Sequence, residues 1–96
     1  MILIDPPAVE WRGRLWSHLA SDDSFAELHV FARALDIPER GFDRDHYDVP
    51  SEFYDAVLAA GATPVSSREL VSRLVAAGLR RRKPRPAPGS GRAQRP

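Results

Sequence analysis

Residues 42–50 read FDRDHYDVP and lie between two segments that have the periodicity of helices. Within this stretch Tyr47 and Val49 alternate with His46 and Asp48, a period of two that is typical of a strand with two different faces. The pattern predicts a strand that turns an aromatic and an aliphatic side chain to one face and an imidazole and a carboxylate to the other. A strand between two helices favours an α/β fold.

Helix signals flank this strand on both sides. Residues 24–27 fit the capping box, and the apolar residues that follow form one stripe, so we expect a helix from about residue 24 to residue 36. Pro50 and Gly61 bracket a second helix. Residues 66–69 form a second capping box and open a third helix that ends at Gly78.

Short apolar runs supply the remaining strands. Residues 1–4 and 62–65 predict one strand each, and residues 15–19 fit either a strand or a single helical turn. The order of elements predicts a small α/β domain with three helices and a three-to-four-stranded, mostly parallel sheet. If residues 15–19 add an antiparallel strand, the sheet becomes mixed.

Length and composition exclude several classes of protein. Ninety-six residues suit one small domain, which we place at residues 1–79. Because the chain has no cysteine, disulfides and thiolate metal sites are excluded, and any divalent metal needs His, Asp or Glu ligands. The N-terminal apolar run is only four residues long, too short for a signal peptide or a membrane span, so we expect a cytoplasmic protein without a membrane partner.

Charge divides the chain into two parts. Residues 1–79 hold seven basic and thirteen acidic residues, a net charge of −6, whereas residues 80–96 hold seven basic residues and no acid. The second part is rich in proline and arginine and predicts a disordered tail. Such a tail can contact nucleic acid weakly and non-specifically or serve solubility alone, and the contacts we expect are made by Arg80, Arg81, Arg82 and Lys83.

The strongest candidate site combines His46 and Asp48 on one strand face with Asp5, which directly follows the first strand. A carboxylate beside an imidazole fixes its tautomer and raises its basicity, as a general base or a metal ligand requires. The alternative is structural: Asp48 caps the next helix, His46 bonds to the backbone and Asp5 caps a turn. Residues 43–45 are interpreted as a solvated loop whose charges compensate one another.

Four further side chains are weaker candidates for binding. His18 shares a strand face with Trp16, and His29 lies on the border of the first helix, where each can equally be a packing residue. Ser66 and Arg68 stand at a helix start, where an anion can bind, although Ser66 as a cap beside an exposed Arg68 is simpler.

Several spaced motifs resemble one known family. They are residues 5–7, 16–19 with 21–22, 27–29 with 31–32, 46–50, and 65–66 with 68–70. In this order the motifs resemble a small bacterial and phage family, common in actinobacteria, that is number 4031 in the domain-of-unknown-function series. The resemblance covers residues 1–79 and implies no activity, so it assigns no catalytic residue. The presence of the family in phages suits a nucleic-acid context.

Two functions are compatible with these patterns. The first is a binding or accessory protein whose tail associates with nucleic acid while the acidic body contacts an unidentified protein. The second is a metal-dependent, nuclease-like hydrolase with Asp5, His46 and Asp48 as ligands or base.

Overall fold

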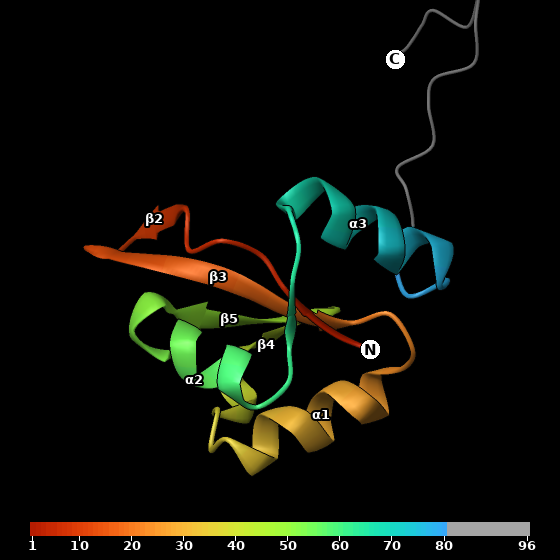
Figure 1. Cartoon of the computed structure of the whole chain (residues 1–96), viewed down its shortest axis with the longest axis horizontal. Coiled ribbons are helices and arrows are strands. Elements are labelled where there is room, and N and C mark those ends of the chain that lie inside the picture. The colour runs from red at the N-terminus through yellow and green to blue at the C-terminus, as the bar shows by residue number, and fades with distance from the viewer. Residues whose placement is uncertain (81–96) are drawn as a thin grey trace, which may run out of the picture.

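The computed structural model describes residues 1–80, in which one sheet lies between helices on both faces (Figure 1). The strands are β1 (Ile2–Ile4), β2 (Val9–Trp11), β3 (Arg14–Ser21), β4 (Phe42–Asp43), β5 (His46–Pro50) and β6 (Thr63–Pro64). The helices are α1 (Phe25–Ala34), α2 (Tyr54–Ala59) and α3 (Ser67–Ala76), with 3₁₀ turns at Glu39–Gly41 and Ser51–Phe53. The small α/β domain with three helices is therefore confirmed for this part of the chain.

The sheet is mixed and has six strands rather than three or four. Its order is β4-β5-β3-β1-β6, and β2 pairs with β3. Only β1 and β6 run parallel, while the other pairs are antiparallel, so a mostly parallel sheet is not borne out. The reason is β3, whose ambiguous pattern at residues 15–19 is part of an eight-residue strand that follows β1 and β2 without a crossover helix.

The turn before β3 explains this antiparallel start. Trp11 pairs with Arg14, so the loop has two residues, and both of them, Arg12 and Gly13, have positive φ angles of 51° and 73°. Positive φ at both loop residues is the conformation of a type I′ turn, whose twist matches that of the adjoining strands. The hairpin therefore turns β2 directly back along β3.

The two faces of the sheet differ in composition. On one face α1 and α2 enclose the larger apolar cluster, which contains Ile4, Leu19, Leu28, Val49 and Val57. On the other face α3 covers a smaller cluster of Leu3, Ala20, Leu70 and Leu74. In Figure 1, α3 lies above the sheet and α1 and α2 lie below it.

The helix starts follow the predicted capping boxes in part. Ser24 accepts a hydrogen bond from the Glu27 amide, and Ser66 accepts one from the Glu69 amide, so both serines are N-caps. The Glu27 carboxylate does not complete its box. It accepts hydrogen bonds from the Ser21 hydroxyl and the Met1 amino group instead, and so ties α1 to the start of β1.

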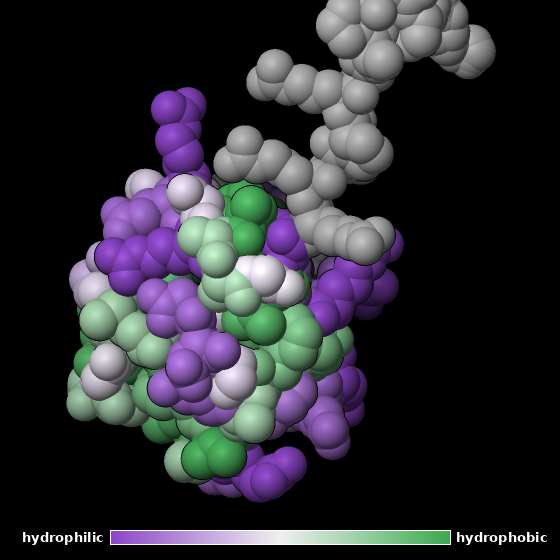
Figure 2. All heavy atoms as spheres, turned by 90° about the vertical axis from the view of Figure 1, so that its right-hand side faces the viewer, coloured by the Kyte–Doolittle hydropathy of each residue, from purple (hydrophilic) through white to green (hydrophobic). Residues whose placement is uncertain are grey.

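Polar and apolar residues are interspersed on the side of the molecule that carries the turn between β3 and α1 (Figure 2). Within residues 1–80 no helix has the length and apolarity needed to cross a membrane. The predicted tail contacts of Arg81, Arg82 and Lys83 lie outside the described residues.

Candidate functional site

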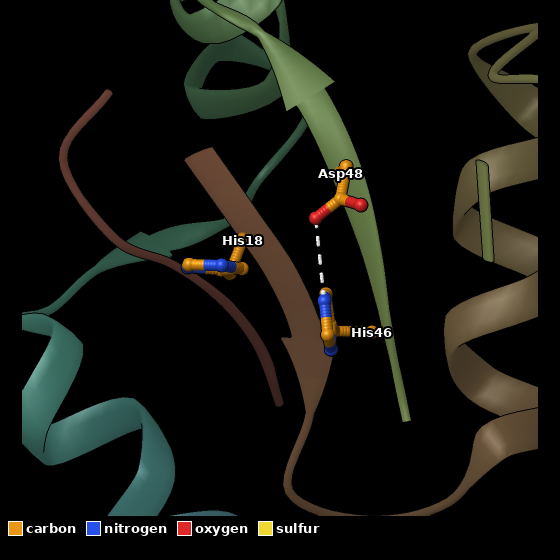
Figure 3. Close-up of side chains that lie close together, drawn as sticks. All are labelled: His18, His46 and Asp48. Carbon is orange, nitrogen blue, oxygen red and sulfur yellow. Dashed lines mark ion pairs between the residues drawn. The ribbon is translucent and has the colours of Figure 1, made fainter. Parts of the chain in front are cut away.

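Two neighbouring strands bring three ligand-type side chains together on the face that α3 covers only in part. His18 on β3 is the register partner of Asp48 on β5, and His46 precedes Asp48 by two residues on the same strand face. The rings of His18 and His46 meet edge to face, with centroids 4.9 Å apart, and Nε2 of His46 lies 3.2 Å from Oδ1 of Asp48. Each residue offers one ligand atom, and the three atoms lie within 4.8 Å of one another (Figure 3).

The His18 ring is fixed by Asp5, which is only 1% exposed. The Asp5 carboxylate accepts three hydrogen bonds, from the His18 amide at 2.6 Å, from Nδ1 of His18 at 2.7 Å and from the Ser67 hydroxyl at 2.8 Å. Because an ionised carboxylate only accepts, Nδ1 carries the proton of the bond between the ring and Asp5. The second ring nitrogen, Nε2, is left for another partner.

Hydrogen bonding sets the charge state of this pair. Burial favours the neutral form of Asp5, but the hydrogen bonds from the His18 ring, the His18 amide and Ser67 outweigh it and hold the pKa of Asp5 below its ordinary value. The hydrogen bond to Asp5 also raises the pKa of His18, against the opposing effect of burial. Asp5 is therefore an ionised carboxylate behind His18.

The His46 ring is fixed in the same way by Asp45, which is 7% exposed. Oδ1 of Asp45 lies 2.8 Å from Nδ1 of His46, and the Arg80 guanidinium donates to both Asp45 oxygens, from Nε at 2.7 Å and from Nη2 at 2.8 Å. The Arg80 guanidinium lowers the pKa of Asp45 to about 2. Asp45 is thus ionised, and it accepts the Nδ1 proton of His46.

This arrangement leaves two acceptors facing each other. With its proton on Nδ1, neutral His46 presents the lone pair of Nε2 to the Asp48 carboxylate, 3.2 Å away. Two lone pairs at this distance need a cation between them, either a second ring proton or a metal ion. Ligands bound at about 2.0–2.1 Å to a tetrahedral zinc ion lie roughly 3.3 Å apart, so the distance fits shared coordination.

The donor set suits divalent transition metals. Two imidazoles and one carboxylate match zinc, manganese or iron, and three protein ligands with a free position are typical of catalytic rather than structural zinc sites. A carboxylate behind each metal-bound imidazole is the usual outer shell of such sites. The Asp48 side chain is 45% exposed, so the free position is open to solvent.

The matched family is described as "Protein of unknown function (DUF4031)", and its model covers residues 2–77 of the chain. The chain belongs to this family. No curated protein and no solved structure matches the chain. Every residue of the site except Arg80 falls within the DUF4031 match, and the family description assigns no chemistry to any of them.

The structure brings some predicted site residues together and separates others. Within this DUF4031 domain, Asp5, His46 and Asp48 are joined through His18, which had been only a weaker candidate. His29 lies on α1, beyond the opposite face, where its Nδ1 is 2.6 Å from the Tyr47 hydroxyl. At the start of α3, Ser66 and Arg68 are exposed, and Ser66 serves as the helix cap.

Three residues of the site were not predicted. Asp45 was interpreted as part of a solvated loop, which is wrong, because it is buried beneath Arg80. Ser67 was overlooked beside the cap Ser66, although it donates to Asp5. Arg80 was assigned to the tail, whereas in the structure it binds Asp45, 35 residues away in the sequence. No local sequence pattern marks a partner at such a separation.

Proposed function

We propose that the protein binds a divalent transition-metal ion through His18, His46 and Asp48 and uses it in a hydrolytic reaction. The observation that carries the proposal is the pair of imidazoles whose Nδ1 atoms are both held by ionised carboxylates. Their Nε2 atoms are left for a ligand beside the half-exposed Asp48. Rings held in this way lose less side-chain freedom when they bind a metal.

The residues around the metal position have separate roles. A divalent cation held by His18, His46 and Asp48 would supply an acidified water and polarise a substrate oxygen. In ester hydrolysis the water oxygen bonds to the acyl or phosphoryl atom, the bond from that atom to the leaving oxygen breaks, and the leaving oxygen takes a proton. Asp5 and Asp45 hold the two rings and strengthen them as donors. Ser67 and Arg80 hold those two carboxylates in turn. The open side next to Asp48 is where a substrate can approach.

Thermal melting of the full-length protein with Zn²⁺, Mn²⁺ or Mg²⁺ tests metal binding. A ligand present at 100 times its dissociation constant stabilises the native state by about 2.7 kcal/mol. For a domain of this size that corresponds to an increase in Tm of roughly 10 °C or more. We expect such an increase with Zn²⁺ or Mn²⁺, and hydrolysis of a chromogenic phosphodiester or carboxylic ester by the metal-loaded protein.

Histidine variants supply the control. His18→Ala and His46→Ala should abolish the metal-dependent increase in Tm, whereas His29→Ala should retain it, because His29 lies on the other side of the sheet. If no divalent ion raises the Tm of the wild-type protein, the proposal is refuted. The contacts of His46 with Asp45 and Asp48 would then serve the fold alone.

Association with polyanions through the basic tail is the second candidate function. It is supported by the contrast between the net charge of −6 in residues 1–79 and the seven basic residues in residues 80–96. A basic segment beside an acidic body can hold nucleic acid weakly and without sequence preference, which leaves the body free to contact a protein partner.

Deletion of residues 81–96 tests this candidate while retaining Arg80 and its contact with Asp45. We expect binding to a mixed-sequence DNA duplex at low salt to be lost on deletion, and binding by the full chain to weaken steeply as salt is added. Equal binding by the two proteins would refute a role of the tail in polyanion association.

A further inference from the structure

The face that carries the metal-type cluster continues into an aromatic surface that α3 leaves uncovered. Beyond His18, this face of the sheet holds Trp16 on β3 and its neighbours Val9 and Trp11 on β2. The β2–β3 hairpin extends past the helices, at the left of Figure 1. Trp11 is 56% exposed and Val9 is 45% exposed, so the hairpin presents large apolar groups to solvent. Exposed apolar groups of this size that lie together commonly mark a binding surface.

The two indoles form a defined structure, which we call the tryptophan shelf (Trp11 and Trp16). Their ring centroids are 5.8 Å apart at an interplanar angle of 59°, and Nε1 of Trp16 donates a hydrogen bond to the Trp11 carbonyl at 3.0 Å. The hydrogen bond fixes the Trp16 ring against the β2 backbone. A fixed indole with an exposed partner offers a flat π surface at small entropic cost.

The tryptophan shelf adjoins the metal-type cluster. Trp16 precedes His18 by two residues on the same strand face, and its register partner Pro50 follows Asp48 by two residues on β5. Two residues of a strand span roughly 7 Å. A ligand can therefore stack a planar ring at the Trp16 side of the shelf and place a phosphate, one sugar away from that ring, beside the metal-type cluster. Trp11, the register partner of Arg14, extends the shelf away from His18.

Cationic groups flank the shelf. The Arg12 guanidinium lies over one face of the Trp11 ring, 4.6 Å from its centroid. Arg14 is on the same hairpin, where it pairs with Glu52 at 3.3 Å between two half-exposed side chains. Exposed pairs of this kind are weak and exchange partners readily. In an otherwise acidic domain, these arginines and the proposed divalent cation suit this surface to an anion that carries a flat ring.

From this placement we propose that the ligand of the site is a nucleotide, with its base stacked on the tryptophan shelf and its phosphate beside His18, His46 and Asp48. The proposal rests on the proposed metal site and names the substrate class for it. Stacking on aromatic side chains accepts any base, because every base has a π face. We therefore expect little preference among the four bases.

Tryptophan fluorescence reports on the shelf directly, because Trp11 and Trp16 are the two tryptophans of the sequence. The full-length protein, loaded with Zn²⁺ or Mn²⁺, is titrated with adenosine monophosphate, with adenosine and with ribose 5-phosphate. We expect strong quenching by adenosine monophosphate, weaker binding of adenosine and no quenching by ribose 5-phosphate. If the phosphate is instead bound elsewhere, for example by the basic tail, adenosine monophosphate and ribose 5-phosphate should give the same fluorescence response.

Variants separate this inference from the metal site. Trp11→Ala should weaken adenosine monophosphate binding about 5- to 150-fold, the effect of removing one stacking partner, while Trp11→Phe should retain most of it. Leu15→Ala is the matched control, because Leu15 is exposed on the opposite face of the hairpin. All three variants should retain the metal-dependent increase in Tm. Calorimetry supplies the affinities where a tryptophan has been removed.

Two results would overturn the inference while leaving the metal site intact. One is an unchanged affinity for adenosine monophosphate in Trp11→Ala. The other is concentration-dependent self-association of the wild-type protein that Trp11→Ala abolishes, which would show that a second copy of the chain covers the shelf. A missing metal response in the wild type would instead refute the proposed function itself.

Discussion

The two faces of the sheet carry different kinds of side chain, although the same strands form both. On the face of α1 and α2, Leu19, Tyr47 and Val49 are buried in the larger core. On the other face, residues of the same strands, among them His18, His46 and Asp48, stay partly accessible and interact mainly through polar groups. Because side chains alternate along a strand, β3 and β5 can stabilise the fold with one half of their residues and hold a site with the other. Substitutions on the face of α1 and α2 should therefore change mainly the stability of the fold, and substitutions on the other face mainly the binding of a ligand.

The largest expected effect is on the core face. Leu19→Ala should lower the free energy of unfolding by about 2–5 kcal/mol, because Leu19 is fully buried and its truncation leaves a cavity. Leu15→Ala, on the same face of the same strand but 45% exposed, should change it by no more than about 0.5 kcal/mol. Chemical denaturation measures both. Equal losses would show that burial of the side chain along β3 does not decide stability.

The second-largest effect is expected at Asp5, where a substitution should change both the free energy of unfolding and the metal affinity. Asp5→Ala removes the acceptor of three hydrogen bonds, so we expect a loss of about 1–3 kcal/mol in unfolding free energy. The orientation of His18 is lost as well, and metal affinity should fall about 10- to 100-fold. Denaturation and calorimetric metal titration test the two effects. Asp23→Ala, at an exposed position, is the control that should change neither.

A smaller effect is expected for Arg80→Ala. The guanidinium contacts Asp45 rather than a ring, so metal affinity should fall severalfold, less than in Asp5→Ala. Arg68→Ala, which removes the same charge from an exposed position on α3, should leave the affinity unchanged. Metal titration of both variants at one ionic strength measures whether Arg80 acts through its contact with Asp45 or through its charge. An equal loss in both would assign the effect to net charge instead of the contact with Asp45.

The smallest effect is the pH dependence of the stability that Glu27 provides at the C-terminal end of β3. The Ser21 hydroxyl and the Met1 amino group lower the pKa of Glu27, so ionised Glu27 stabilises the folded protein above the pKa of the unfolded chain. This contribution is lost as pH falls through the lower pKa of the folded state. The difference in Tm between the wild type and Glu27→Gln should be small, because the side chain is 38% exposed, and should shrink below about pH 4. A difference in Tm that increases at low pH would contradict the predicted direction.

The local sequence predicted the elements better than their arrangement. Two capping boxes predicted the starts of α1 and α3, and the alternation at residues 46–49 predicted both the strand and the shared face of His46 and Asp48. A mixed sheet with an antiparallel strand at residues 15–19 was only an alternative to a mostly parallel one, because the choice depends on the pairing of β3 with β1 and β5. Pairing over such distances leaves no pattern in any one segment.

The same reasoning explains what was missed in the site. The contacts from Ser67 to Asp5 and from Arg80 to Asp45 span 62 and 35 residues of sequence. His18 was a weak candidate because an imidazole beside a tryptophan is usually a packing residue, and its role depends on Asp5, 13 residues earlier. Such contacts follow from the topology of the sheet, which places the end of β1 beside the middle of β3.

These long-range contacts have a consequence for synthesis on the ribosome. The proposed ligand residues His18, His46 and Asp48 are made early, but the groups that hold the carboxylates behind the two rings, Ser67 and Arg80, are made later. Chains emerge from the N-terminus, so a growing chain that stops before residue 80 has the ligands without their full support. Metal binding as proposed would therefore favour chains that extend through residue 80 over shorter ones and couple loading of the ion to synthesis of that segment.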